Sequence, residues 1–386
     1  MAENGIATYS LRSLVLYFLK LGATGFGGPV ALVGYMHRDL VENRKWISED
    51  DYREGLALSQ LAPGPLAAQL GIYIGYVHYR LLGATLTGLA FVLPSFIMVL
   101  GLGIAYKYYQ GISWMQAVFY GVGAAVIGII TVSAWKLTRK TVGKDYYLWF
   151  IYLVAAVTTV ITENENVLLF IAAGIFYWLV KSAGSLRSKA GASAQFILPV
   201  FLQIDAGVNQ PGKLHDIFLF FIKAGAFVFG SGLAIVPFLY GGVVKEYGWL
   251  NEQEFMDAVA VAMITPGPVV ITVGFIGYLT AGFSGASVAA LATFFPCYLF
   301  TVIPAPYFKK YGKKPGIKAF VDGITAAAIG AIAGAVIVLG KRSISDIPTA
   351  LICAAVIAIL FLTKKIPEPF IILAAAGIGL LIKAHL

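Results

Sequence analysis

The stretch "LALSQLAPGPLAAQLGIYIGY" (residues 56–76) decides how this chain folds. It reads as an apolar helix that is interrupted by Pro-Gly-Pro at 63–65. Nearly the same pattern returns as "VAVAMITPGPVVITVGFIGY" at 259–278, with a second Pro-Gly-Pro at 266–268. Proline ends or kinks a helix because it lacks an N–H and clashes with the preceding turn. Two such interruptions in apolar helices predict two related halves, each built around a broken helix.

The chain has the composition of an integral membrane protein. Of its 386 residues, 59% are hydrophobic and only 12% are charged, and the mean hydropathy is +0.83. Apolar runs at 84–106, 116–135 and 286–308 approach or exceed the roughly 20 residues that a helix needs to cross a ~30 Å hydrocarbon layer. We therefore expect an all-α polytopic protein that passes several times through the plasma membrane, with the lipid bilayer as a partner.

The charges and cysteines argue against several other classes of protein. The net charge of +9 comes mainly from cations in short loops between spans, so a nucleic-acid partner is not expected. Cys297 and Cys353 lie in apolar runs without metal-ligand spacing, and the four histidines form no metal-binding pair. No nucleotide-binding or nucleophile motif follows a strand pattern. We expect no metal, no cofactor and no enzyme activity.

The relation between the halves extends beyond the Pro-Gly-Pro sites. "FLKLGATGFGG" (18–28) lies over "FIKAGAFVFGS" (221–231) in the same register as the two motifs, and after one residue is dropped the match continues farther along the chain. Matched pairs include Lys20 with Lys223, Gly22 with Gly225, Gly27 with Gly230, Trp46 with Trp249, and Pro94 with Pro296. Matched lysine, tryptophan and proline positions favour duplication over a chance likeness among small apolar residues.

Loop charges predict that the two halves have opposite orientations. Lys and Arg are concentrated in short cytoplasmic loops. The first half is basic at 136–144 and 181–189, whereas the second half is basic at 309–318, which corresponds to an uncharged stretch of the first. Inverted halves need an odd number of crossings each. We expect about ten in total, rising to about twelve if the broken segments cross, with the Pro-Gly-Pro helices forming re-entrant hairpins.

The same alignment predicts the domain boundaries. The first repeat covers 1–180, a cytoplasmic linker and the start of the second half cover 181–212, and the second repeat covers 213–386. The linker sequence "KSAGSLRSKAGASAQ" is polar, basic and rich in small residues. A homodimer is left open.

The broken helices predict an anion site. A helix that starts inside a membrane has free N–H groups, here at 66–68 and 269–271, and these attract anions. The candidate site residues are Lys20, Gly27, Gly28, Gln60, Pro63, Gly64, Pro65 and Leu66 in the first half, and Lys223, Gly230, Ser231, Thr265, Pro266, Gly267, Pro268 and Val269 in the second. The alternative is that the prolines only kink a packed helix and that the glycines only allow close packing.

The matched lysines lie at an unusual depth. Lys20 comes nine residues after Leu11, roughly 13 Å along a helix and near the middle of a ~30 Å layer. Lys223 has the same place after Leu214. A lysine near a span end usually extends to the interface, whereas a central one is aimed at a cavity, a partner or a substrate. Two at one symmetric position favour a substrate, with both lysines facing one central cavity.

Two acidic residues also correspond. Glu54 and Asp257 each lie nine residues before a Pro-Gly-Pro. They follow helix-start sequences with capping-box spacing, so we expect most of the acids there to cap solvated helices. Proton coupling is the alternative role.

These motifs resemble the chromate ion transporter family. The likeness rests on "FLKLGATGFGGP", the tryptophan before an acidic helix start, "LSQLAPGP" and "GIYIGY", together with their counterparts in the second half. It implies a fused two-domain member that moves chromate, with sulfate as the chemically similar anion. The second half departs from the first at 231–232 and 263–265, which predicts unequal roles for the two halves.

Residues and resemblance together predict a secondary transporter of a tetrahedral divalent oxyanion. Chromate is the leading substrate, and the resemblance implies efflux and hence chromate resistance. The alternatives are a transporter of sulfate or another anion and a passive anion channel. A membrane-embedded chromate reductase is disfavoured because no flavin, haem or redox-cysteine motif is visible.

Overall fold

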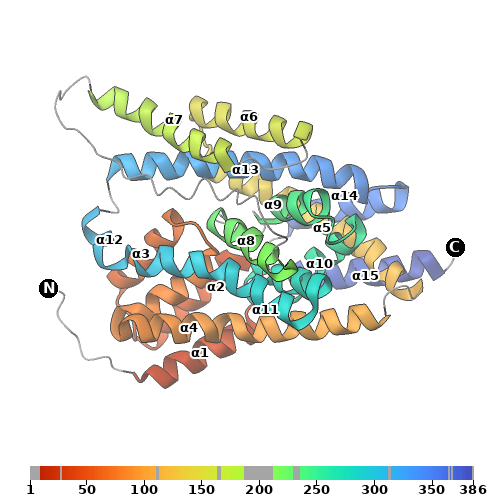
Figure 1. Cartoon of the computed structure of the whole chain (residues 1–386), viewed down its shortest axis with the longest axis horizontal. Helices are drawn as coiled ribbons and strands as arrows, with labels where there is room; N and C mark the ends of the chain where they lie inside the picture. The colour runs from red at the N-terminus through yellow and green to blue at the C-terminus, as the bar shows by residue number, and fades with distance from the viewer. Residues whose placement is uncertain are drawn as a thin grey trace.

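The computed structural model describes residues 9–26, 28–109, 113–162, 167–186, 212–228, 235–311, 314–363, 366 and 368–384, and the regular structure in them is helical (Figure 1). The first part of the chain contains α1 (Leu11–Thr24), α2 (Gly28–Met36), the π-helix η1 (His37–Asn43), α3 (Glu49–Leu61), α4 (Leu66–Tyr109), α5 (Ser113–Thr141), α6 (Tyr146–Thr162) and α7 (Val167–Leu186). The second part contains α8 (Lys213–Ala226), α9 (Ile235–Tyr240), the π-helix η3 (Gly241–Glu246), α10 (Glu252–Ile264), the 3₁₀ turn η4 (Val269–Ile271), α11 (Thr272–Val302), α12 (Ala305–Tyr311), α13 (Pro315–Ser343), α14 (Ile347–Leu362) and α15 (Glu368–Ala384).

Four of the described helical stretches are long and apolar enough to cross a membrane. They are Leu66–Tyr109, Gln116–Thr141, Val269–Phe308 and Pro315–Ser343, and shorter apolar helices occupy Tyr146–Thr162, Leu168–Ser182 and Ile347–Leu362. These lengths fit a polytopic membrane protein, as the composition predicted. The count of about ten crossings stays a prediction.

The two longest helices each contain a reversal. In α4 the backbone leaves the helical region at Arg80, with φ 52° and ψ −140°, and in α11 it does so at Gly282, with φ 62° and ψ −152°. Beyond Arg80 the chain returns along itself, because the Thr87 hydroxyl donates a hydrogen bond to the Gly71 carbonyl over 3.1 Å. Each long helix therefore consists of a short first arm and a longer second arm.

The first Pro-Gly-Pro joins two antiparallel helices. A Cβ atom at Gly55 in α3 would overlap the ring of Tyr73 in the first arm of α4. These residues lie on opposite sides of the motif, and a continuous helix would hold them roughly 27 Å apart at ~1.5 Å per residue. The chain thus turns back at 63–65, and α3 and the first arm of α4 form a hairpin.

A similar hairpin precedes it in the chain. The Tyr17 hydroxyl of α1 donates to Asp39 Oδ2 of η1 over 3.4 Å, although the break between α1 and α2 separates them in sequence. The π-helix arises because the Arg44 amide donates to the Asp39 carbonyl, five residues back. In the second half, the Tyr247 amide donates to the Gly242 carbonyl in the same way. Local structure therefore recurs at positions that the sequence repeat makes equivalent.

The two parts of the chain are interleaved rather than side by side. The long helix α13 packs on α6 and α7, which lie together along the upper edge of Figure 1, while α14 and α15 pack on α5. A Cβ at Gly121 would overlap the Ala375 carbonyl, and a Cβ at Gly323 would overlap the Ala173 carbonyl. The repeat exchanges these two close contacts, because Gly121 corresponds to Gly323 and Ala173 to Ala375. The long helix after each second arm thus packs on the last two helices of the other part.

The second arms of α4 and α11 run antiparallel. Thr85, at the start of one, is hydrogen-bonded to the Tyr298 hydroxyl near the end of the other, with 2.8 Å between their oxygens. At its far end the arm of α4 reaches α10, where Tyr106 contacts Asp257. These two corresponding arms therefore point in opposite directions.

Candidate functional site

Each Pro-Gly-Pro turn is hydrogen-bonded to the backbone just after α1 or α8 in the opposite part of the chain. The Gly64 amide donates to the Val228 carbonyl over 2.5 Å, and the Gly267 amide donates to the Gly25 carbonyl over 2.9 Å. The two donors are equivalent in the sequence repeat, and so are the two acceptors. A break leaves backbone groups unpaired, and in apolar surroundings such groups need a partner. Here the backbone of the opposite part supplies it.

Both central glycines have conformations that suit glycine alone. Gly64 has φ +142° and Gly267 has φ +94°. A Cβ at Gly267 would overlap the hydroxyl of Ser95, which follows Pro94 in the second arm of α4. A Cβ at Gly64 would press on the side chain of Gln69. The Pro-Gly-Pro turns therefore fit tightly against both parts of the chain.

A cavity of about 630 Å³ lies beside the break between α1 and α2. Its lining comprises Tyr17, Lys20, Leu21, Thr24, Gly25, Phe26, Tyr35, Arg38, Asp39, Arg44, Ile264, Pro369, Phe370 and Leu373. Three of these side chains are cationic and one is anionic. The lining also joins the two parts of the chain, because Ile264 ends α10 just before the second Pro-Gly-Pro.

The cations of this cavity are only partly neutralised. Arg38 Nε pairs with Asp39 Oδ1 at 3.2 Å. The Arg44 guanidinium lies over the Tyr17 ring at 5.3 Å and over the Trp46 ring at 4.6 Å. Among the described residues, neither Lys20 nor Arg44 has a carboxylate within ion-pair distance. The cavity thus has an excess of positive charge, which suits an anion.

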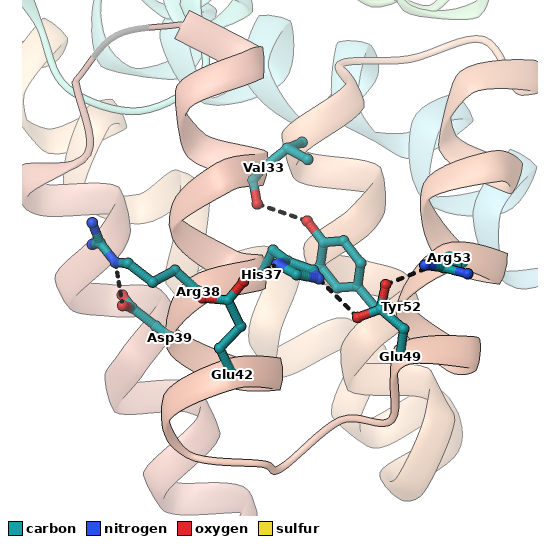
Figure 2. A network of polar contacts seen from close by, with 8 residues as sticks. All are labelled: Val33, His37, Arg38, Asp39, Glu42, Glu49, Tyr52 and Arg53. Atoms are coloured by element: carbon teal, nitrogen blue, oxygen red, sulfur yellow. Dashed lines mark hydrogen bonds and ion pairs between the residues drawn. The ribbon is translucent and has the colours of Figure 1, made fainter.

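A polar network fixes the π-helix that carries Arg38 and Asp39 (Figure 2). His37 contacts Glu42 on one side at 3.1 Å and Glu49 of α3 on the other at 2.8 Å. Arg53 also pairs with Glu49, and the hydrogen bonds from His37 and Arg53 hold the pKa of that carboxyl below its ordinary value. The network therefore ties η1 to the start of the next hairpin.

The corresponding place in the second part of the chain is filled by aromatic rings. Tyr17, Tyr35 and Arg44 are replaced there by Phe220, Phe238 and Tyr247, while Arg38 and Asp39 become Gly241 and Gly242. Phe220 stacks on Phe238 at 5.3 Å, and Tyr247 stacks on Trp249 at 4.5 Å. Among the aligned positions of the described residues, only Lys223 retains the positive charge of its counterpart at this place. The two parts therefore differ in their side chains at this place, while unequal roles of the two halves stay a prediction.

The structure brings only some of the sequence-predicted residues to the cavity. Both lysines are exposed, and only Lys20 lines the cavity. Gln60 is exposed at the end of α3, and Gly28 begins α2 with φ +71°. Gly27, Gly230 and Ser231 lie outside the described residues. The expectation that the two lysines face one central cavity stays a prediction. The cavity described here does not support it, because Lys223 is not among its lining residues.

The expected backbone donors also differ between the breaks. Leu66 is half-buried at the start of α4, and the Gln69 amide is already bonded to the Pro65 carbonyl. After the second break, the Ile271 amide is bonded to the Pro268 carbonyl, because the helix begins there as a 3₁₀ turn at Val269. Ile271 is thus not a free donor. The Thr265 hydroxyl donates to the Ala262 carbonyl of its own helix.

Sequence analysis does not single out Arg38 and Arg44 as candidate ligands, because nothing in the local pattern distinguishes them from the other charges between 37 and 53. Their replacement by Gly241 and Tyr247 at the equivalent positions is the signal that could have found them. Charge alone does not separate them from Lys45 or Arg53.

Comparisons with known proteins agree with the repeat motifs. The sequence pattern of the family described as "Chromate transporter" matches the chain twice, at residues 12–178 and 215–380. A chromate transport protein of Cupriavidus metallidurans is 67% identical over 97% of this chain and 93% of its own length. A probable chromate transport protein of Synechococcus elongatus is 63% identical over 97% of this chain and 96% of its own.

A more distant relative extends the likeness. A chromate transport protein of Pseudomonas aeruginosa is 29% identical over 96% of this chain and 92% of its own. No solved structure matches the chain significantly. With the family pattern present in both parts and two relatives at 63% and 67% identity along nearly the full length, this chain belongs to the chromate transporter family.

Proposed function

We propose that this chain is a secondary transporter that exports a tetrahedral divalent oxyanion, first of all chromate, across the plasma membrane. The observation that carries the proposal is the cavity at the α1–α2 break, where Lys20, Arg38 and Arg44 meet with one carboxylate. The names of the relatives support chromate as the substrate. Sulfate has the same charge and shape, so it is the competing substrate.

The chemistry of the cavity suits an oxyanion. Arg44 presents a planar guanidinium that can donate two parallel hydrogen bonds to neighbouring oxygens, while Lys20 supplies a compact charge. The stacking of Arg44 on the rings of Tyr17 and Trp46 orients the guanidinium without neutralising its charge. A dianion bound there would satisfy both cations. In this proposal the Pro-Gly-Pro residues and Leu66, Val269 and Thr265 form the walls of the path along which the anion moves, and Lys223 serves a weaker second step.

The transport path requires access from both sides, and an inverted repeat would provide it. We place the basic ends of α5 and α7 and the Arg80 turn in the cytoplasm, following the distribution of Lys and Arg. The antiparallel second arms of α4 and α11, and the contacts that recur between repeat-equivalent residues, support opposite orientations of the halves. The hairpins then enter the membrane from opposite faces and meet at the four breaks. About ten crossings, an odd number in each half, remain part of this proposal.

The test is flux of labelled chromate and sulfate into vesicles that contain only the purified full-length protein. A carrier is expected to show saturable chromate flux and competition by sulfate. It should also take up labelled chromate faster when the vesicles already contain unlabelled chromate. Flux without saturation or counterflow would favour a passive channel. Reduced chromium in the vesicles would point to an enzyme.

The matched pair Lys20→Met and Lys223→Met tests the site. A charge-assisted hydrogen bond is worth about 1.5 to 3 kcal/mol, so Lys20→Met is expected to weaken chromate binding roughly tenfold or more. Lys223→Met is expected to have a smaller effect, because aromatic rings replace the arginines around it. Equal, wild-type affinity in both variants would show that the anion binds elsewhere.

A further inference from the structure

Asp257 is a buried carboxylate that the anion cavity does not use. It lies on α10 and is 4% exposed. Its Oδ2 accepts a hydrogen bond from the Tyr106 hydroxyl at 2.7 Å, and its Oδ1 accepts one from the Gln253 amide at 2.8 Å. Both donors are neutral. Capping, the role expected for most of these acids, is carried out at this helix start by Asn251 and Glu254.

The surroundings of Asp257 contain no compensating charge among the described residues. From α4 the titratable neighbour is Tyr106, and from its own helix it is Glu254, whose charge repels an ionised Asp257. Phe119 of α5 and Phe275 of α11 pack edge-on against the Tyr106 ring at 5.7 and 5.5 Å. A buried carboxylate without a cation is costly when ionised and is stable when it holds a proton.

The Tyr106–Asp257 contact also joins the two parts of the chain. Tyr106 lies near the end of the second arm of α4, and Asp257 lies in the hairpin on the opposite side of the sequence repeat. A movement that separates the second arm of α4 from α10 would break this contact. The charge on Asp257 and the relative position of the two parts are therefore linked.

A short route connects Asp257 to the surface. Gln253, one helical turn earlier on α10, is exposed and hydrogen-bonded to the carboxylate. This end of α10 lies near the end of the α4 second arm that is opposite the Arg80 turn. Our proposed orientation places that end of the arm outside the cell. Asp257 is thus one turn from the external surface.

The equivalent residue of the first half is in a different setting. Glu54 is half-buried and interacts with the Tyr73 hydroxyl of its own hairpin, a contact within one part of the chain. It offers a matched control for Asp257.

We propose that Asp257 binds the coupling proton, taking it up from the outside and releasing it inside as the oxyanion leaves the cell. The proton adds to a carboxylate oxygen on uptake, and Tyr106 then turns from donor to acceptor. This step rests on the proposed function, because it supplies the driving force for the same transport cycle. One proton-binding site per chain makes the exchange sensitive to the pH difference across the membrane.

The test uses the full-length protein in vesicles that contain a pH-sensitive dye, with chromate as the probe. Asp257→Asn mimics the protonated carboxyl. It is expected to keep chromate-for-chromate exchange within about twofold, but to lose proton movement and pH-driven chromate accumulation by roughly tenfold or more. Glu54→Gln is expected to keep all three. Wild-type proton movement in Asp257→Asn would overturn the proposal, whereas a wild-type protein that exchanges no chromate would overturn the proposed function instead.

A second variant keeps the test decisive if Asp257→Asn fails to fold. Tyr106→Phe removes one donor to the ionised carboxylate and keeps the ring. The midpoint of the pH profile of pH-driven transport is expected to move to higher pH by about one unit, since a hydrogen bond to a charged group is worth about 1.5 kcal/mol or more. An unchanged midpoint in Tyr106→Phe would contradict the role of Asp257.

Discussion

The amide of Gly64 donates its hydrogen bond to the carbonyl of Val228, so the backbone of one part of the chain closes the helix break of the other. The same relation holds between Gly267 and Gly25, which are the repeat counterparts of Gly64 and Val228. Because these bonds pair backbone groups that a helix break leaves without an intrahelical partner, each Pro-Gly-Pro turn depends on the opposite part for its stability.

Replacing Gly267 by Leu is expected to reduce transport without preventing membrane insertion. The positive φ costs a side-chain residue about 1–2 kcal/mol, and the new side chain would also displace Ser95. Gly64→Leu should behave similarly. Gly101→Ala is the control, because a Cβ there meets open space. Thermal unfolding in detergent and chromate flux would be measured for each variant. Wild-type flux in both leucine variants would show that the Pro-Gly-Pro turns serve packing and not transport.

Arg44→Met is expected to weaken chromate binding by about tenfold, since a charge-assisted hydrogen bond of at least about 1.5 kcal/mol is lost. Arg44→Lys should be intermediate, because it keeps the charge but loses the planar fork and its stacking on Trp46. Binding to the purified protein would be followed by titration with chromate. Arg139→Met, at a cation that lies over Trp135 and away from the cavity lining, provides the control. Equal affinities in the Arg44 and Arg139 variants would exclude Arg44 from the site.

Single-cysteine labelling is expected to place Lys140 in the cytoplasm and Gly282 outside. The two positions are not repeat equivalents, so the result tests the inverted arrangement directly. A membrane-impermeant thiol reagent would be applied to intact cells and to inverted vesicles, on a background without Cys297 and Cys353. If both positions react from the same side, the two halves are not inverted as proposed.

Asp145 predicts an acid-sensitive contact at the α5–α6 turn. Burial raises the pKa of Asp145, but hydrogen bonds from Lys181 and Tyr177 outweigh this and lower it. A lowered pKa means that the stabilisation is complete above the ordinary value of 3.8 and is lost as the pH falls through the folded-state value. Asp145→Asn should therefore lower the melting temperature at pH 7 by about 1–3 °C, as expected for an exposed pair. The difference from wild type should shrink below pH 3.8, and a constant difference across this range would contradict the assignment.

The sequence could predict the parts of this fold that depend on local pattern. Pro63 and Pro266 mark real breaks, the apolar runs are helices, and Ser48 and Asn251 cap α3 and α10. The π-helical turns could not be read from sequence, because they depend on an extra residue per turn rather than on an apolar period. Arg44 looks like a loop charge in the sequence, and only the structure shows that it lines the same cavity as Lys20.

The interleaved packing has a consequence for biosynthesis. Since α5 needs α14 and α15, and α13 needs α6 and α7, the first-made helices cannot reach their final neighbours until the last ones have left the ribosome and entered the bilayer. During that interval Gly121 of α5 lacks its close contact with Ala375. A cut in the finished protein between α7 and α8 should therefore leave the two fragments associated. Truncation before α14 should leave α5 without its packing partners and expose the nascent chain to quality-control proteolysis.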